Sequence, residues 1–154
     1  MGRPRGFDEQ AVTAAAAELF AGRAYDGVSV DDLVQQLGVH RNSLYKTFGS
    51  KRGLYLAALR WHLEHRLPSL TEQLAAGAAV ADDPALDLLL LAAVERAPSD
   101  VEVAALVAKA WLALDQALRR APATPADPSA STALNALLGE RLRARAATAS
   151  AGPS

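Results

Sequence analysis

The sequence predicts an all-helical protein, from its composition, its apolar spacing and its helix caps. Hydrophobic residues make up 51% of the 154 residues but aromatic residues only 5%, so alanine and leucine must fill most of the core. Both residues favour helices, as do the abundant Glu, Arg and Gln. Apolar residues recur at helical spacing, and no stretch alternates between apolar and polar residues as a strand would. The chain is long enough and apolar enough to form one packed domain, or a small domain with a second helical unit.

The first half of the chain is expected to form four helices. They span residues 9–23, 30–37, 40–48 and 51–67. The clearest start is Ser29, followed three residues later by Asp32, which is a variant of the capping box. Gly38 follows the second helix at the position where a left-handed residue usually ends a helix.

The second half is expected to form four more helices, at about residues 70–79, 84–96, 100–120 and 132–147. Their predicted starts are the capping box at Ser69, Asp83 followed by a proline, the capping box at Ser99, and Thr132. Residues 121–131 are rich in Pro, Ala and Ser and are predicted to be a mobile connector. The tail, residues 148–154, is predicted to be disordered.

Charge is spread unevenly along the chain. The whole chain has 16 Lys and Arg against 17 Asp and Glu, but residues 33–63 contain no acid at all. The cations in this window are Arg41, Lys46, Lys51, Arg52 and Arg60. Solvated surfaces usually mix both signs, so a surface of one sign is expected to face an anionic partner.

Residues 30–37 and 40–48 are two short helices separated by a glycine turn, which is the pattern of a helix-turn-helix. On the second helix, Arg41, Asn42, Tyr45 and Lys46 fall within an arc of about 140°, opposite the apolar residues. This arc offers hydrogen-bond donors for phosphate oxygens and base edges.

The flanks of this pair of helices fit the same use. Ser29 and Lys51 lie at helix N-termini, where backbone N–H groups attract phosphate. Arg3 and Arg5, in an N-terminal arm, are placed to reach the DNA backbone or the minor groove.

These residues resemble the DNA-binding domain of the TetR (tetracycline repressor) family over residues 8–60. The marks of the resemblance are Leu19-Phe20, Tyr25-Asp26-Gly27, Ser29-Val30, Leu33, Gly38-Val39, Leu44-Tyr45, Phe48 and Ser50-Lys51. The resemblance implies that the helix of residues 40–48 enters the major groove. The DNA-contacting set it implies comprises Arg3, Arg5, Ser29, His40, Arg41, Asn42, Ser43, Tyr45, Lys46 and Lys51.

Within that set, Ser29, Tyr45 and Lys51 are expected to position the protein on the phosphates. The candidate base readers are His40, Arg41, Asn42 and Lys46. His40 departs from the family pattern, which usually has a small residue, commonly Ser, at this position. Two interpretations of His40 stay open: it contacts DNA through its imidazole, or it is only a mediocre helix cap.

The resemblance also implies a domain organisation. Residues 1–50 would be the arm and the DNA-binding domain, residues 51–67 a connecting helix, and residues 68–147 a helical dimerisation and ligand-binding domain. The implied function is that of a bacterial, cytoplasmic regulator, most simply a repressor. It would bind a palindromic operator in double-stranded DNA as a homodimer and leave it when a small molecule binds.

A dimer is also expected from the residues themselves, because two late helices carry apolar stripes. The predicted interface comprises Val107, Trp111, Leu114, Leu118, Leu134, Leu138 and Leu142. A small core of this kind needs such help to bury its apolar faces.

A ligand pocket is expected by family analogy, for a small hydrophobic molecule. The candidate lining residues are Trp61, His65, Leu89 and Trp111. The alternative is a DNA-binding or protein-interaction module that has no small-molecule ligand.

Other classes of function find no support in the sequence. It has no cysteine, no glycine-rich phosphate loop and no plausible catalytic set, so we expect neither an enzyme nor a cofactor. His62 and His65 are spaced to share a metal ion, but imidazoles at a helix end are more often solvated, and no metal is predicted. No signal peptide or membrane span is visible, and no membrane partner is expected.

Overall fold

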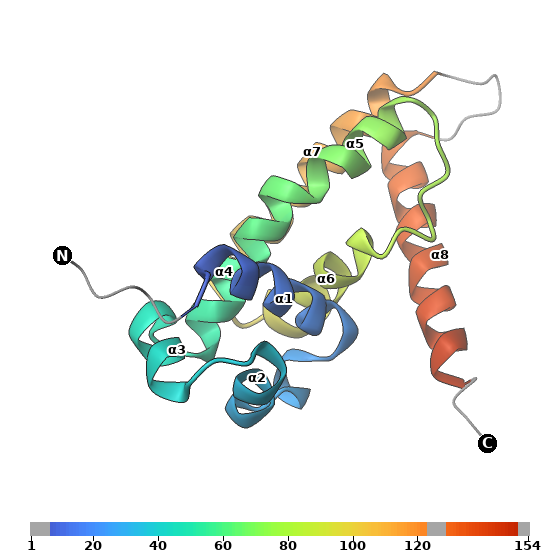
Figure 1. Cartoon of the computed structure of the whole chain (residues 1–154). Helices are drawn as coiled ribbons and strands as arrows, with labels where there is room; N and C mark the ends of the chain where they lie inside the picture. The colour runs from blue at the N-terminus through green and yellow to red at the C-terminus, as the bar shows by residue number, and fades with distance from the viewer. Residues whose placement is uncertain (1–6, 123–128, 151–154) are drawn as a thin grey trace.

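The fold is a set of packed helices (Figure 1). The computed structural model describes residues 7–122 and 129–150, and within these ranges it contains no strand. The helices are α1 (Glu9–Gly22), the 3-10 turn η1 (Tyr25–Gly27), α2 (Val30–Leu37), α3 (Arg41–Phe48), α4 (Lys51–His65), α5 (Leu67–Ala75), α6 (Ala85–Leu91), the π-helical turn η2 (Ala92–Arg96), α7 (Val101–Arg120) and α8 (Ala130–Ser150). The prediction of an all-helical chain is confirmed.

The first three helices and the start of α4 form an N-terminal unit around a small apolar core. Phe20 on α1, Leu33 on α2 and Leu44 on α3 are all fully buried there. Leu44 anchors the inner face of α3, so the other face of this helix is left at the surface.

Local capping explains why α2 and α3 begin and end where they do. The hydroxyl of Ser29 accepts a hydrogen bond from the backbone N–H of Asp32 at 3.0 Å, and the Asp32 carboxylate accepts one from the N–H of Ser29 at 2.8 Å. The predicted capping box is therefore confirmed. Gly38 ends α2 with a φ of 65°, a left-handed conformation that favours glycine.

The helical domain lies beyond α4. Figure 1 shows α5 and α7 side by side, with α8 along the other side of the domain. Here α6 packs against α1, so the two parts of the chain share a boundary formed by α1, α4 and α6. Leu86, Leu88, Leu89 and Leu114 are fully buried in this domain.

Two predicted helix starts are wrong. The helix expected from about residue 70 begins at Leu67, directly after α4, because Pro68 lies in its first turn, where a missing N–H costs no hydrogen bond. The capping residue of α7 is Asp100 and not Ser99: the Asp100 carboxylate accepts from the N–H of Glu102 and of Val103.

The last helix is longer than predicted. It runs from Ala130 to Ser150, so residues 148–150, expected in a disordered tail, are helical. The core of the expected connector, residues 123–128, and the end of the tail lie outside the described residues. None of the helices formed by the described residues is both long and apolar enough to cross a membrane.

Candidate nucleic-acid interface

The outer face of α3 is a surface of hydrogen-bond donors. His40, Arg41, Asn42, Tyr45 and Lys46 are all exposed, and 39% of Tyr45 is accessible. His40 occupies the N-cap position of α3 but makes no capping hydrogen bond through its side chain. The structure therefore brings together the predicted base-reading residues on one exposed face.

The other residues predicted to contact DNA around this face differ in exposure and in their contacts. Ser43 is half-buried, and Ser29 uses both its N–H and its hydroxyl in contacts with Asp32. The two arginines of the N-terminal arm, Arg3 and Arg5, lie outside the described residues.

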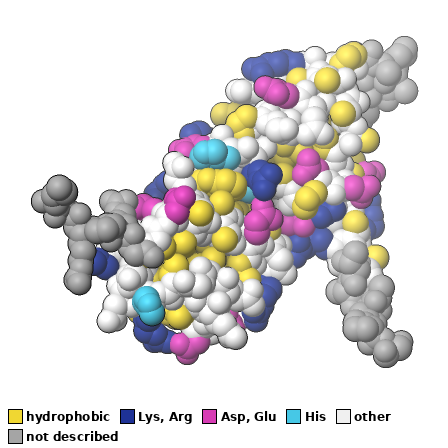
Figure 2. All heavy atoms as spheres, viewed as in Figure 1, with side chains coloured by type: hydrophobic (Ala, Val, Ile, Leu, Met, Phe, Trp, Pro, Cys, Tyr) yellow, Lys and Arg dark blue, Asp and Glu magenta, His cyan; other side chains and the backbone are white. Residues whose placement is uncertain are grey.

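Arg41 is engaged by an acid from the neighbouring helix. Its guanidinium is hydrogen-bonded and ion-paired to the carboxylate of Asp31 on α2. Cationic and acidic side chains accordingly lie next to one another over the α2–α3 end of the molecule (Figure 2). The absence of acids from residues 33–63 therefore does not make this surface free of acids.

Lys51, at the start of α4, rests on an aromatic ring. Its Nζ lies 4.1 Å from the centre of the Tyr25 ring, and the guanidinium of Arg96 lies 4.4 Å from the same centre. Partial burial lowers the pKa of the Lys51 ammonium, although Asp26 acts in the opposite direction. Lys51 is thus held by the protein at the edge of the α3 face.

The remaining cations of the acid-free window turn away from α3. Arg52 donates from Nε to Asp100 at 2.7 Å and from Nη2 to the same carboxylate at 2.9 Å, and Arg60 donates to Glu102 at 3.2 Å. The hydrogen bonds from Arg52 hold the pKa of the Asp100 carboxyl well below its usual range. Reading all five cations as one partner-facing surface is therefore wrong for Arg52 and Arg60, which pair with acids of α7.

A second link joins the turn before α2 to the helical domain. The backbone N–H of Tyr25 donates to the Glu95 carboxylate at 3.1 Å. The Tyr25 ring also packs edge-on against Tyr55 of α4, with ring centres 4.9 Å apart. Together with Arg52–Asp100, this contact connects the helix-turn-helix to the junction of η2 and α7.

The residues predicted to line a ligand pocket do not meet in one cavity. Leu89 is fully buried in the core, and Trp61 stacks on His65 with ring centres 4.8 Å apart. A cavity of about 200 Å³ lies instead between α1, α4, α5 and the start of α6, and of the four candidates only His65 lines it. Trp61 lines a separate hollow with Asp8, Glu9, Gln10 and Thr13, so the four predicted residues do not share one of these two cavities.

The residues predicted to form the dimer interface differ in how deeply they are buried. Val107 and Leu114 are covered within the chain itself, with 4% and 0% of their surface accessible, so they offer no surface to a second copy. The other predicted residues keep accessible surface: Trp111, Leu118, Leu134 and Leu138 are half-buried and Leu142 is exposed. The exposed Leu112, which the prediction omitted, adds to them.

His62 is the buried histidine of the boundary between the two parts. Its Nε2–H donates to the carbonyl of Ala85 at 2.7 Å, and burial lowers its pKa below the ordinary value of 6.5. The folded protein therefore resists protonation that the unfolded chain accepts. Its contribution to stability is fully present above pH 6.5 and is lost as the pH falls through 6.5 towards the folded pKa.

We expect the free energy of unfolding to be lower at pH 5.5 than at pH 7.5, as measured by urea denaturation at both values. In His62→Gln, whose amide can still donate to Ala85, this difference should shrink, since the other two histidines are exposed. An unchanged pH dependence in the variant would show that other groups cause it.

A helix-turn-helix with an exposed donor face, joined to an all-helical second domain, is an arrangement found in DNA-binding proteins. Residues 12–58 match the family model described as "Bacterial regulatory proteins, tetR family". The match covers less than half of the chain, so it shows that the N-terminal part is similar to this family.

Two bacterial transcriptional regulators match part of the chain. The chain is 41% identical over 80 residues to the HTH-type transcriptional regulator YezE of Bacillus subtilis. The matched segment covers 52% of this chain and 41% of YezE. The chain is 43% identical over 58 residues to the transcriptional repressor BdcR of Escherichia coli. This matched segment covers 38% of this chain and 29% of BdcR. The chain thus spans less than half the length of these relatives.

A solved structure resembles nearly the whole chain. The TetR family transcriptional regulator CifR, in complex with a 26-base-pair operator, aligns with a TM-score of 0.62 over 93% of this chain and 89% of CifR, at 24% identity. This likeness shows that the second domain, as well as the first, has the fold of a TetR-type regulator.

Proposed function

We propose that the protein is a non-enzymatic, sequence-specific transcriptional regulator that binds double-stranded DNA as a homodimer. The observation that carries the proposal is the outer face of α3, where His40, Arg41, Asn42 and Lys46 are exposed together on a helix anchored by Leu44. A helix of this kind fits the major groove, and two copies would read the halves of a palindrome about one DNA turn apart. Repression is the sign of regulation that we favour, and the cytoplasm is where a bacterial regulator meets its DNA.

The dimer part of the proposal is supported by apolar surface that a monomer leaves uncovered. Leu112 and Leu142 are 58% and 46% accessible, and both lie on the last two helices, which pack against each other. A second copy that packs on α7 and α8 would bury them in an isologous interface.

The test is binding of the purified protein to the intergenic DNA beside its own gene, at two salt concentrations, with random DNA as competitor. We expect specific binding of one dimer per palindrome, with an affinity that falls as salt rises. Equal affinity for random DNA, or a monomer at the operator, would contradict the proposal.

Two single substitutions on α3 should separate base reading from phosphate contact. Asn42→Ala is expected to change sequence preference at one base pair by about 1–3 kcal/mol, because an amide contacts a base edge. Tyr45→Phe, which removes only a phosphate-directed hydroxyl, should weaken binding to all sequences by about 1 kcal/mol. The measurement is a competition assay with operators changed at single positions; a uniform loss for Asn42→Ala would remove it from the base-reading set.

We also propose that a small-molecule ligand changes the affinity of the protein for DNA. The alternative, a DNA-binding module with no ligand, is favoured by the small size of the cavity at the domain boundary, since drug-sized ligands usually occupy about 300–1,000 Å³. Which of the two holds depends on what this cavity binds.

A further inference from the structure

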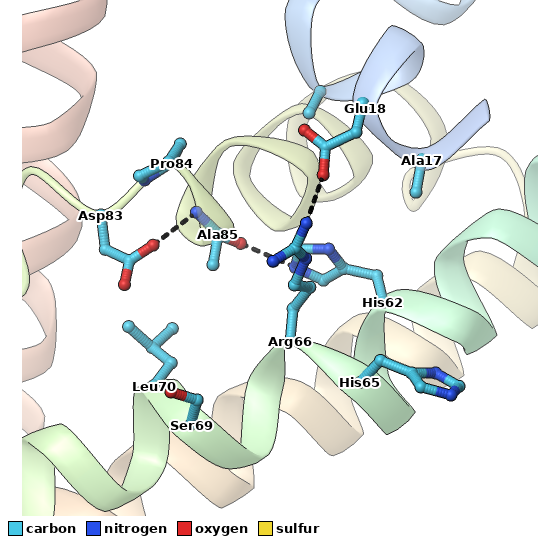
Figure 3. A pocket seen from close by; sticks show the side chains of 11 residues that line it. Ala17, Glu18, His62, His65, Arg66, Ser69, Leu70, Asp83, Pro84 and Ala85 are labelled. Carbon is cyan, nitrogen blue, oxygen red and sulfur yellow. Dashed lines mark hydrogen bonds and ion pairs between the residues drawn. The ribbon is translucent and has the colours of Figure 1, made fainter. Parts of the chain in front are cut away.

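The cavity at the domain boundary is lined by both apolar and polar side chains. Ala17 and Ala21 of α1, with Leu70, Pro84 and Ala85, form the apolar part. The polar side chains around it are Glu18, His62, His65, Arg66, Ser69 and Asp83 (Figure 3). Its volume of about 200 Å³ limits the occupant to a small molecule.

The charged side chains around the cavity differ in how they are paired. Arg66 donates from Nη2 to Glu18 Oε1 at 2.9 Å, so these two charges neutralise each other across the cavity (Figure 3). His62 is neutral, since burial lowers its pKa and its Nε2–H is used by Ala85. One Asp83 oxygen accepts from the N–H of Ala85 at 2.8 Å, and Asp83 forms no ion pair with any described residue. Asp87 chiefly, and Asp82 and Asp83 to a lesser degree, raise the pKa of the Arg141 guanidinium, so Asp83 has a cation in its surroundings.

We propose that this cavity binds a small organic ammonium ion with a compact apolar body. The ammonium would lie at the unused oxygen of Asp83, and the body against Ala17, Leu70 and Pro84. A carboxylate with one oxygen outside any hydrogen bond, next to apolar side chains, favours a cation of this kind. The cation can pair with that oxygen and bury its hydrocarbon at the same time.

Occupancy of the cavity would act on both parts of the chain. Its walls come from α1, which packs on α4 in the N-terminal unit, and from α5 and the start of α6. The Arg66–Glu18 ion pair beside the cavity ties α1 to the end of α4, so loss of Glu18 would leave the Arg66 cation unpaired next to the ammonium. A ligand that binds the DNA-free arrangement more tightly than the DNA-bound one lowers operator affinity by the ratio of the two affinities; this step rests on the proposed function.

The binding test uses three probes of matched shape and different charge: cyclohexylammonium, cyclohexanol and cyclohexanecarboxylate. Isothermal titration calorimetry on the full chain should show saturable binding for the ammonium and at least tenfold weaker binding for the alcohol and the carboxylate. Equal binding of the ammonium and the alcohol, or no saturable binding of the ammonium, would overturn the proposal.

Two variants locate the site. Asp83→Asn keeps an oxygen that can accept from Ala85 and should weaken ammonium binding at least tenfold, whereas Asp82→Asn, on the exposed neighbour, should leave it unchanged. Glu18→Gln, on an exposed side chain that does not contribute to the core, is the second variant and should also weaken it. Unchanged binding in both Asp83→Asn and Glu18→Gln would place the probe elsewhere and refute the assignment.

The DNA test separates the two proposals. Saturating cyclohexylammonium should lower operator affinity at least threefold in the parent protein and leave it unchanged in Asp83→Asn. A protein that binds its operator but not the ammonium refutes only the cavity assignment. A protein that binds the ammonium but no operator refutes the proposed function.

Discussion

Replacing Phe20 with alanine is expected to lower the free energy of unfolding by about 3–5 kcal/mol, the largest effect of any single change considered for this protein. Phe20 is 1% accessible and lies where α1, η1 and α4 meet. Its ring packs edge-on against Tyr55 at 5.0 Å and is stacked on Tyr25 at 6.0 Å between ring centres. Alanine would leave a cavity that these rings cannot fill without moving.

Chemical denaturation followed by circular dichroism measures this loss directly. Phe7→Ala is the matched control, because Phe7 also stacks on another ring, Phe48 at 6.4 Å, but is only half-buried. We expect it to cost about 1 kcal/mol. Similar losses for the two variants would mean that Phe20 does not hold the three elements together.

Asp87→Ala is expected to have the second largest effect, about 3 kcal/mol, because it leaves a nearly buried guanidinium without its partner. The Asp87 carboxylate accepts from Nε and Nη2 of Arg141 at 2.7 and 2.8 Å, and Nη1 of Arg145 lies 3.0 Å away. Although burial opposes it, these hydrogen bonds lower the pKa of the Asp87 carboxyl. The cluster ties α8 to α6.

The same substitution should weaken the dimer, since α8 carries part of the proposed interface. Urea denaturation and sedimentation velocity measure the two effects. Asp115→Ala breaks an ion pair of the same 2.8 Å length, but with an exposed partner, Arg119, and should cost less than about 1 kcal/mol. If Asp87→Ala and Asp115→Ala behave alike, the Asp87 cluster does not hold α8.

The helix-turn-helix could be predicted from sequence because its signals are local. Ser29 and Asp32 cap α2 within four residues, and Gly38 ends it in a left-handed conformation that hardly depends on the rest of the fold. The base-reading face follows from helical spacing alone once Leu44 is assigned to the core.

Long-range pairing could not be predicted in the same way. A run of cations without acids in sequence says nothing of acids that arrive from elsewhere, and Asp100 and Glu102 lie 48 and 50 residues beyond Arg52. The stripe on α7 shows the same limit, because an apolar spacing that marks Val107 and Leu114 for burial does not say whether the chain itself or a second copy covers them. The cavity was missed because its walls come from four separate segments.

The contacts between the N-terminal unit and the helical domain limit how the helix-turn-helix can be moved to another protein. Tyr25 and Arg52 both belong to the N-terminal part, yet their partners Glu95, Arg96 and Asp100 all lie in the stretch that leads into α7. A chimera that grafts residues 7–66 onto a foreign dimerisation scaffold would strip away all three partners at once. A transferable helix-turn-helix would have to include residues 92–103 as well as residues 7–66. The smallest unit that can be exchanged therefore consists of two separate segments of the sequence.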